Sequence, residues 1–489
     1  MSVNLETPAK NVDITSAEYK TMLRNLQANI LWAHGRNFAR HLFLRFTAPP
    51  AAVKEWIRGS VAPEVTTAAE QLDQITRRRA DRSFDGGLVR GFFLSAKGYE
   101  FLEFDTDQFA SGTFRKGMKD QNDRFLTDIV NDIMDTNNKD PEPGTWEPGF
   151  RNEIHALITV ADSAENKGNE AAATIRASFA GIGEVLTVEE GTVLRRKNQA
   201  TGGESESVEH FGYFDGISNP LFTKQDLNDE LPENKNRLAW DAGARLSLVL
   251  VDDPFSGEED TFGSYLVYRK LSQDVAAFNE RVKALAASLS TNEALAGAMV
   301  VGRFKDGTPV VKTNTPSLGA QLENDFNFDA DLQGVKCPIH SHIRKVNPRG
   351  TTPLTSLESE RRRRIVRRGI PYGKPMPGVA DSTPADPNPT APRGLLFMCF
   401  QHNVEEQFEF IQRTWVDNEH FPKGVLTLGV LGDTGDDPLI GQDANEAQRW
   451  PKKWGDRDAG KKTFNFESAV TLKGGEYFFA PSIPFLRSL

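Results

Sequence analysis

Hydrophobic residues in the first half of the chain form two kinds of pattern. Short runs rich in aromatic and β-branched residues predict strands, and longer runs with apolar residues three or four positions apart predict helices. The predicted strands cover residues 41–46, 88–94, 154–160 and 183–195, the last as one strand or a pair. Helices are predicted from Pro49 and Pro50, since proline suits the first turn of a helix, and over residues 66–79 and 163–179.

The second half of the chain repeats this order of strands and helices. Its predicted strands cover residues 262–269 and 394–401, and a final strand pair ends at 474–481. Predicted helices cover 272–289 and 404–415, and a short apolar segment lies at 297–302. The helix at 404–415 has an apolar stripe formed by Val404, Phe408, Ile411 and Trp415. The long region 306–393 has no periodic pattern, which is typical of functional or disordered segments.

Two α+β halves with the same order of elements predict a duplicated architecture. The alternation of helices with split strand pairs is typical of the β-α-β-β-α-β layout of a ferredoxin-like unit. We place the first domain at residues 1–240 and the second at residues 241–489. The crevice between two such halves is a natural site for a cofactor.

Composition narrows the class of protein and its partners. The chain has 489 residues, of which 38% are hydrophobic and 26% charged, which is typical of a globular protein with two or more cores. Its net charge of -10 argues against nucleic-acid binding, because contact with phosphates requires a concentrated basic face. No apolar run has the length of a membrane span, and residues 1–15 lack the layout of a signal peptide. We therefore expect a cytoplasmic protein without a membrane partner, or an extracellular one if this chain is a mature form.

Two features of the composition concern particular side chains. Cys337 and Cys399 are the only cysteines, which excludes a disulfide-rich scaffold. The basic run 361–364 continues at Arg367 and Arg368, so that six arginines occupy eight positions. This run is either a solvated helical face or a site for a small anion.

A stretch at residues 337–349 combines possible metal ligands with cations. Cys337, His340 and His342 are followed by Arg344 and Arg349. Neutral imidazole is a common ligand for metals and haem iron, and the cations suit an anionic cofactor such as haem with its propionates. A zinc site formed by the cysteine and the two histidines is an alternative, although the spacing offers no convincing fourth ligand.

Two more segments carry side chains suited to acid–base or electrostatic chemistry. Asp215 lies between aromatic residues and a glycine, and apolar surroundings favour proton exchange by a carboxyl group near the working pH. The same Asp-Gly pair is also common in turns. Arg367 precedes a rigid turn at residues 369–373 and could direct a fixed guanidinium into a cavity.

Taken together, these motifs resemble the dye-decolorising peroxidase family. Four patterns carry the resemblance: Gly-x-x-Asp-Gly followed by Asn-Pro; Cys-Pro-x-x-x-His-Ile-Arg-Lys-x-Asn-Pro-Arg; Arg-x-Gly-Ile-Pro-Tyr-Gly; and Leu-Leu-Phe with Phe-Glu-Phe-Ile-Gln-x-x-Trp. Their order and separation match the family from about Leu26 to the C-terminus. The resemblance implies two ferredoxin-like domains with haem b between them. It also implies that His342 is the proximal iron ligand, with Asp215 and Arg367 on the distal side and His340 in a structural role.

The resemblance further implies how the cofactor is surrounded. Leu395 and Phe397 are expected to line the distal pocket, and Arg344 and Arg349 to pair with the haem propionates. Glu405 is the candidate to accept a hydrogen bond from the non-ligating nitrogen of His342, which would raise the basicity of the imidazole. Two further residues compete for that role, namely Glu406 and Glu409.

The expected activity is reduction of hydrogen peroxide through a ferryl intermediate, followed by one-electron oxidation of dyes, phenols and similar reductants. Asp215 would move the proton and Arg367 would stabilise the charge on the leaving oxygen. Trp415 and Tyr372 match positions that carry radicals in some family members, so bulky dyes could be oxidised at the surface through Trp415. The alternative is that Trp415, which extends an apolar helical stripe, is a core residue. A manganese-oxidising site is also conceivable at a cluster of acids, Asp325, Asp329 and Asp331. The alternative function is a haem-binding or storage module without turnover.

Overall fold

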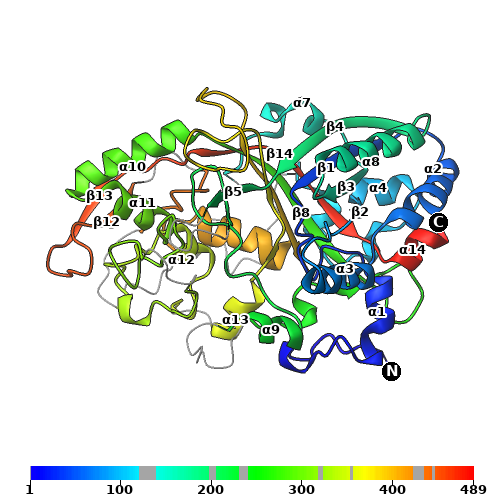
Figure 1. The fold of residues 1–489 in the computed structure, drawn as a ribbon, viewed down its shortest axis with the longest axis horizontal. Coiled ribbons are helices and arrows are strands. Elements are labelled where there is room, and N and C mark those ends of the chain that lie inside the picture. Colours follow the sequence, from blue (N-terminus) through cyan, green and yellow to red (C-terminus); the bar gives the residue numbers. More distant parts are fainter. Residues whose placement is uncertain are drawn as a thin grey trace.

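Most strands of the chain join one antiparallel sheet (Figure 1). The computed structural model describes residues 2–120, 139–197, 205–230, 241–317, 323–352, 356–421, 434–442 and 447–489. The order of the strands in this sheet is β7-β8-β14-β2-β3-β1-β4-β10-β11-β9, and β8 also pairs with β11. The additional pairing closes the strands from β8 to β11 into a ring. Because closure pairs the backbone N–H and C=O groups of β8 and β11 with one another, it removes sheet edges that would otherwise be exposed.

The strands have the following bounds. The large sheet contains β1 (Phe38–Phe46), β2 (Val89–Leu94), β3 (Ala156–Asp162), β4 (Gly183–Thr192), β7 (Val251–Asp252), β8 (Phe262–Gln273), β9 (Val366–Arg367), β10 (Ile370–Tyr372), β11 (Gly394–Gln401) and β14 (Val470–Ala480). Two small antiparallel pairs are formed by β5 (Leu194–Lys197) with β6 (Ser205–Val208), and β12 (Gln448–Pro451) with β13 (Lys461–Phe464).

The described helices are mostly short. The α-helices are α1 (Lys20–Asn25), α2 (Pro50–Trp56), α3 (Ala68–Ala80), α4 (Ala96–Phe101), α5 (Gly112–Lys116), α7 (Pro148–Arg151), α8 (Glu165–Ser178), α9 (Lys224–Glu230), α10 (Val275–Leu289), α11 (Glu293–Val301), α12 (His342–Val346), α13 (Leu357–Arg362) and α14 (Ile483–Ser488). Two π-helices are η3 (Ile57–Val61) and η9 (Glu405–Val416). Single 3₁₀ turns are η1 (Ala9–Asn11), η2 (Ala17–Tyr19), η4 (Ala62–Glu64), η5 (Thr106–Gln108), η6 (Pro143–Thr145), η7 (Leu246–Leu248) and η8 (Asp329–Asp331).

The local predictions are largely confirmed, but the arrangement of the sheet differs from the expectation. The structure contains the strands predicted from short aromatic and β-branched runs and the helices predicted from spaced apolar residues, so the α+β class is correct. The apolar segment 297–302 belongs to helix α11, and the helix predicted at 404–415 is the π-helix η9. Strands from both halves share one sheet. The predicted boundary at residue 240 lies in 231–240, outside the described residues.

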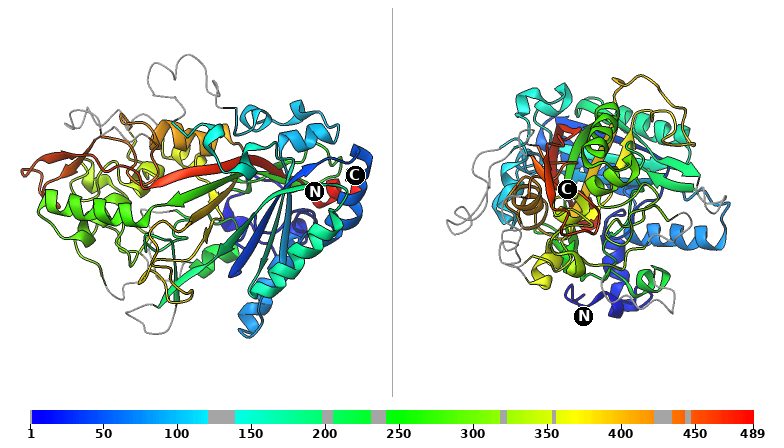
Figure 2. Two further views of the ribbon diagram at one scale, coloured as in Figure 1. Left: turned by 90° about the horizontal axis from the view of Figure 1, so that it is seen from above. Right: turned by 90° about the vertical axis from the view of Figure 1, so that its left-hand side faces the viewer.

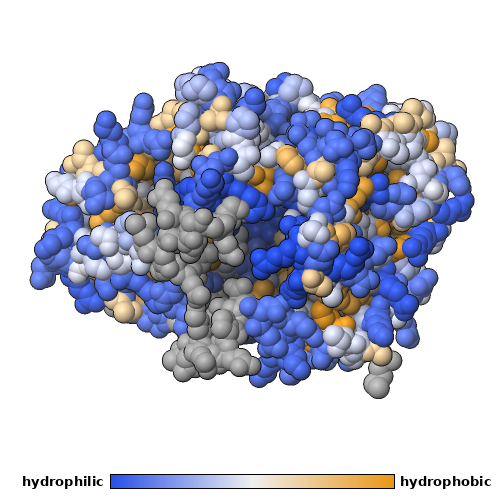
Figure 3. Space-filling view, in the orientation of Figure 1, coloured by the Kyte–Doolittle hydropathy of each residue, from blue (hydrophilic) through white to orange (hydrophobic). Residues whose placement is uncertain are grey.

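Two groups of helices lie at opposite ends of the molecule (Figure 1). Helices α2, α3 and α8 and both termini lie at one end, where α8 packs along β1 and β3 (Figure 2). Helices α10 and α11 lie at the other end, where their apolar residues form a second core with Phe211, Trp450 and Phe466. The face shown in Figure 3 is mostly hydrophilic and is hollowed near its centre.

Capping residues define where helices α10 and α11 begin and where α11 ends. The side chain of Asp274 accepts a hydrogen bond from the first turn of α10, and Asn292 does the same for α11, which satisfies amides that a helix leaves unpaired. Helix α11 ends at Gly302 with a φ of 99°. A Cβ atom there would lie 2.3 Å from Cγ1 of Ile343, so glycine lets the residue next to His342 pack against this helix end.

No single helix among the described residues is long and apolar enough to cross a membrane. Helices α10 and α11 pass the same test only as a pair, and they meet at an angle of 109°.

The close approach of β11 to β8 leads to a prediction about stability. A Cβ atom on Gly394 would lie 1.9 Å from the backbone oxygen of Leu271, so Gly394→Ala must separate the strands that close the sheet. We expect the free energy of unfolding to fall by about 3 kcal/mol, measured by urea denaturation. Gly168 in α8 is the matched control, because a Cβ atom there meets nothing within 4 Å. Gly168→Ala should raise the free energy of unfolding by up to about 1 kcal/mol, and equal losses in both variants would contradict the prediction.

Candidate active site

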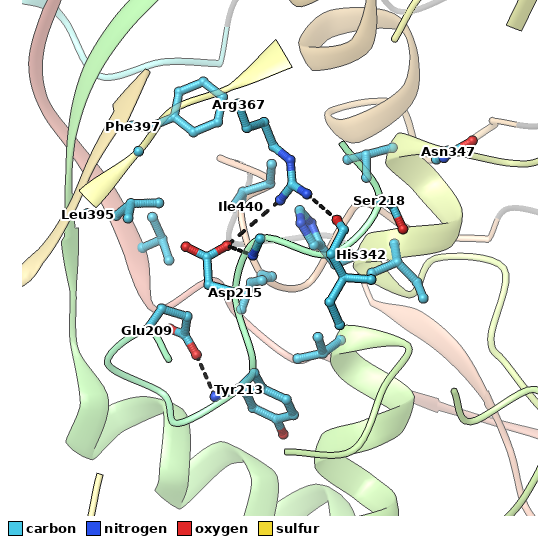
Figure 4. Close-up of a pocket in the computed structure, with 18 of the residues that line it drawn as sticks. Glu209, Tyr213, Asp215, Ser218, His342, Asn347, Arg367, Leu395, Phe397 and Ile440 are labelled. Atoms are coloured by element: carbon cyan, nitrogen blue, oxygen red, sulfur yellow. Dashed lines mark hydrogen bonds and ion pairs between the residues drawn. The ribbon is translucent and has the colours of Figure 1, made fainter. Parts of the chain in front are cut away.

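A cavity of about 300 Å³ lies where the second core meets the closed sheet. Its walls come from the loop at 209–218, strands β8 and β11, helix α12 and helix η9. Figure 4 shows that Asp215 and Arg367 face one another there, with the ring of His342 nearby. Most of the other lining side chains are apolar, including Leu271, Val301, Ile343, Leu395, Phe397, Phe408, Ile411, Leu439 and Ile440. The volume lies at the lower end of the range typical of ligand sites.

His342, the first residue of α12, is oriented by a buried carboxylate. Its Nδ1 lies 2.8 Å from Oδ2 of Asp437, whose side chain has no solvent exposure. The second oxygen of Asp437 accepts hydrogen bonds from the backbone amides of Leu439 at 2.8 Å and Ile440 at 3.2 Å. A carboxylate held in this way favours a proton on Nδ1, so Nε2 keeps its lone pair. His342 thus lines the cavity with a nitrogen that is chemically able to bind a metal.

This geometry corrects the predicted partner of His342. Glu405 instead accepts hydrogen bonds from the amide and hydroxyl of Thr113, at 2.6 and 3.0 Å. Glu409 binds Arg413 and the hydroxyl of Tyr477, which commits its carboxylate elsewhere. Glu406, the other alternative, lies 3.5 Å from Nε2 of His402 and does not contact His342 either. No local pattern marks Asp437, which is 95 residues from His342 along the chain.

Asp215 and Arg367 line the cavity at a separation that permits an ion pair. Nη1 of Arg367 lies 3.9 Å from Oδ1 of Asp215, and both side chains are about one-third exposed, 36% and 33%. Another nitrogen of Arg367 donates to the backbone oxygen of Ile217. Oδ1 of Asp215 accepts the amide of Gly216 at 2.7 Å, in a turn where Gly216 has a φ of 92°. Asp215 is thus both a turn residue and a carboxylate directed at the cavity.

The two arginines expected near haem propionates have different environments. Arg349 lines the cavity, as its predicted role requires. Arg344 is buried away from the cavity and donates hydrogen bonds to the backbone oxygens of Asp331 at 2.9 Å and Cys337 at 2.7 Å, and to the Asp331 carboxylate at 3.3 Å. The structure contradicts the prediction for Arg344, because its side chain does not border the cavity.

The arginine run does not form one face or one anion site. Arg363 donates to the backbone oxygen of Glu406 and lies over the ring of Phe410, 4.0 Å from its centroid. Arg364 borders the cavity and donates to the backbone oxygens of Asp241 and Gly243. The others point in further directions, as in Arg368, which binds the carbonyls of Asn29 and Ile30. Arg363, Arg364 and Arg368 thus contact three different segments of the chain.

Trp415 and Tyr372 are both buried, and for Trp415 this contradicts oxidation of dyes at the surface and agrees with a core residue. Trp415 is 2% exposed and stacks on Phe421 with ring centroids 5.2 Å apart. Tyr372 is 7% exposed and lies under the ammonium group of Lys270. A bulky dye at the surface cannot contact an indole that is enclosed in this way.

The alternative metal sites are not assembled by the fold. Among the described residues, no three His, Cys, Asp or Glu side chains converge as metal ligands would. His340 is buried edge-on against Trp450, with ring centroids 4.3 Å apart, whereas His342 faces the cavity. In the acidic cluster, the carboxylate of Asp331 accepts the amides of Val335 and Cys337. These contacts give His340 and Asp331 structural roles.

Comparison with known proteins places the chain in a family. Residues 207–422 match the C-terminal region of Dyp-type peroxidases. The chain is 35% identical over 493 residues to the multifunctional dye peroxidase DyP2 of Amycolatopsis sp., with all of both chains covered. It is 30% identical to the dye-decolorizing peroxidase msp1 of Mycetinis scorodonius, covering 96% of this chain and 87% of the relative. The crystal structure of a DyP-type peroxidase from Anabaena sp. superposes with a TM-score of 0.85 at 40% identity, covering 99% of this chain and 98% of that one.

The chain therefore belongs to the dye-decolorizing peroxidase family. It is an oxidoreductase that acts on hydrogen peroxide. Peroxidases of this family depend on haem.

A buried acid behind the cavity wall predicts how stability depends on pH. Asp417 accepts hydrogen bonds from Nε2 of Gln412 at 2.8 Å and the amide of Gln442 at 3.0 Å, and both glutamines line the cavity. Burial raises the pKa of Asp417 to about 7, and the nearby carboxylate of Asp140 also raises it. Between pH 4 and 7 the folded state thus binds more protons than the unfolded state, so stability falls as pH rises.

Asp417→Asn should remove this part of the pH dependence. Relative to the variant, the parent's free energy of unfolding should fall by up to about 1 kcal/mol per pH unit between pH 4 and 7. Urea denaturation at several pH values measures the difference. Parallel curves for the two proteins would show that Asp417 is ionised throughout this interval.

Proposed function

We propose that this cavity binds haem b and that the enzyme oxidises dyes, phenols and similar reductants in one-electron steps. The observation that carries the proposal is the convergence of His342, Asp215 and Arg367 on one cavity, with His342 held by the buried Asp437. The similarity to relatives named as dye peroxidases supports the choice of reductant.

The residues of the cavity fit a flat, largely apolar group with anionic substituents. Nε2 of His342 has no hydrogen-bond partner among the described residues and would coordinate the iron. The apolar walls suit a macrocycle, and Arg349 at the cavity suits a propionate. The hydrogen bond to Asp437 would raise the basicity of His342 and favour oxidised iron.

Haem, when bound, supplies the iron at which peroxide is reduced. Asp215 would accept a proton from one oxygen of peroxide and return it to the oxygen that leaves as water. Arg367 would orient the peroxide and stabilise negative charge on the departing oxygen, an effect that is larger where water is excluded. Leu395 and Phe397 would limit the water that competes for these polar groups.

The strand order supports a duplicated ferredoxin-like origin for the two halves. In the first half β4, β1, β3 and β2 are neighbours in that order, so the last strand pairs with the first. In the second half β14, β8, β11 and β9 follow the same order. We infer two ferredoxin-like units that share one sheet, with the proposed haem site between them.

The role of His342 predicts the fate of the cofactor in a variant. His342→Ala removes the only side chain that we propose as iron ligand, so haem content after reconstitution should fall at least about tenfold. The absorption spectrum and a haem assay measure this. His402→Ala is the control, because His402 is half-buried outside the cavity, next to Glu406. A parent-like spectrum in His342→Ala would refute the assignment, and bound haem without peroxide turnover in the parent would favour a storage module.

The distal residues should affect peroxide reduction in different ways. Asp215→Asn keeps the shape but cannot take up the proton, so the rate of reaction with peroxide should fall about 10²- to 10⁴-fold. Arg367→Leu removes a positive charge and should cost about 10²- to 10³-fold. Stopped-flow spectroscopy of the haem-loaded variants measures both. If Asp215→Asn reacts as fast as the parent, proton transfer belongs to Arg367 or water, and Asp215 is only a turn residue.

A further inference from the structure

Asn324 is a buried amide behind the cavity wall, and three side chains donate hydrogen bonds to its Oδ1 atom. The donors are the hydroxyl of Ser218 at 2.7 Å, Nη2 of Arg303 at 2.9 Å and Nη2 of Arg349 at 2.6 Å. These three residues line the cavity, whereas Asn324 does not. Guanidinium groups only donate hydrogen bonds, so the atom that faces the arginines must be the carbonyl oxygen of Asn324.

The two arginines are themselves tightly held. Both lie over the ring of Phe326, with Arg303 at 5.2 Å and Arg349 at 3.9 Å from the ring centroid. Nη1 of Arg349 donates to the backbone oxygens of Asn324 and Phe326 at 2.7 and 2.6 Å. Nη1 of Arg303 donates to the backbone oxygens of Gly307 and Glu323, both at 2.8 Å. The two arginines therefore fix the side chain of Asn324, which in turn accepts the hydrogen bond from Ser218.

Ser218 needs such support because its backbone is strained. Its φ is 70°, and that of Arg349 is 55°, both in the left-handed region that residues with side chains seldom adopt. Conformations of this kind persist where surrounding contacts enforce them, and they concentrate at functional sites. Here the same oxygen atom of Asn324 binds both strained residues, one three positions after Asp215 and the other seven positions after His342.

The neighbours of Ser218 connect this strain to the distal side of the cavity. The backbone oxygen of Ile217 accepts a hydrogen bond from the guanidinium of Arg367. On the other side, Oδ1 of Asn219 accepts the backbone amide of Arg367 at 3.2 Å. A change in the backbone of Ser218 would therefore move both groups that bind Arg367, and with them the loop that carries Asp215.

We propose that Asn324 is a positioning residue for the peroxidase reaction. Its Oδ1 holds Ser218 in the left-handed conformation and so fixes Asp215 relative to Arg367. This inference rests on the roles proposed above for Asp215 and Arg367, but the positioning itself can be measured without haem.

Hydrogen exchange in the haem-free protein tests the positioning. The amide of Asp215 donates to the backbone oxygen of Ser207 at 3.0 Å, so its exchange rate reports opening of the loop. Asn324→Ala should speed this exchange by about tenfold or more, because hydrogen bonds from charged groups are lost. Asn327→Ala is the matched control, because the side chain of Asn327 pairs with nearby Asp329. In this variant the Asp215 amide should exchange hydrogen at the parent's rate.

Rescue in the haem-loaded protein separates positioning from general damage. Asn324→Ala should slow the reaction with hydrogen peroxide about 10- to 100-fold per bound haem, since small misplacements of catalytic groups have effects of this size. Asn324→Asp keeps an oxygen acceptor and should restore most of the rate. Adding Ser218→Gly to Asn324→Ala should also recover part of it, because glycine adopts positive φ without support.

The outcomes distinguish this inference from the proposed function. Ser218→Ala removes one donor with little loss of packing, so it serves if Asn324→Ala does not fold, and it too should speed exchange at Asp215. Parent-like exchange in these variants would overturn the positioning role. Faster exchange without any slowing of the peroxide reaction would overturn its link to catalysis. A fast peroxide reaction in Asp215→Asn would instead refute the proposed role of Asp215, while leaving the exchange result intact.

Discussion

The pairing of β8 with β11 is the constraint on which the rest of the molecule depends. It closes the sheet, and it places Leu271 opposite Leu395 and Arg269 opposite Phe397. Side chains alternate between the faces of a strand, so these four residues border the cavity. Leu396, which lies between Leu395 and Phe397 on β11, is buried in the main core instead. The same pair of strands thus separates the core from the cavity. A one-residue shift in register would exchange the two sets of side chains.

The cavity's proximal wall depends on contacts between distant segments. Asp437 reaches His342 because its own amide binds the backbone oxygen of Val416, at the end of η9, at 3.0 Å. That helix also carries Phe408 and Ile411 into the cavity wall. The amide of Asp417 bonds to the carbonyl of Gln412, five residues earlier, in the π-helical pattern. The widened turn therefore positions both an apolar wall and the carboxylate that orients the imidazole.

The part of the cavity wall that carries Asp215 is organised by irregular backbone rather than by regular elements. Asp215, Ser218 and Arg349 all lie in loops, and their positions follow from turns and side-chain hydrogen bonds. Loops are suited to this because they can direct polar groups inward, but the rigidity must come from tertiary contacts. Asn324 and the two arginines that bind it supply such contacts. Ser218 and Arg349, which both have positive φ, donate hydrogen bonds to the same oxygen of Asn324.

The sequence by itself determined the features that depend on near neighbours. Short apolar runs produced strands such as β1 and β11, and spaced apolar residues produced helices such as α10, because these patterns reflect the geometry and burial of each element. The resemblance of their motifs to the dye-decolorizing peroxidase family selected Asp215, His342 and Arg367 as residues of one site, and all three line the cavity.

Only the tertiary structure decided which distant residues meet. The acid beside His342 is Asp437 rather than Glu405, because a hydrogen bond across 95 residues leaves no local pattern. Arg344 and Arg349 occupy similar basic surroundings in the sequence, yet one is bound by Asp331 and the other borders the cavity. Burial of Trp415 likewise follows from its contact with Phe421. These outcomes depend on how segments pack, and packing is a property of the closed sheet as a whole.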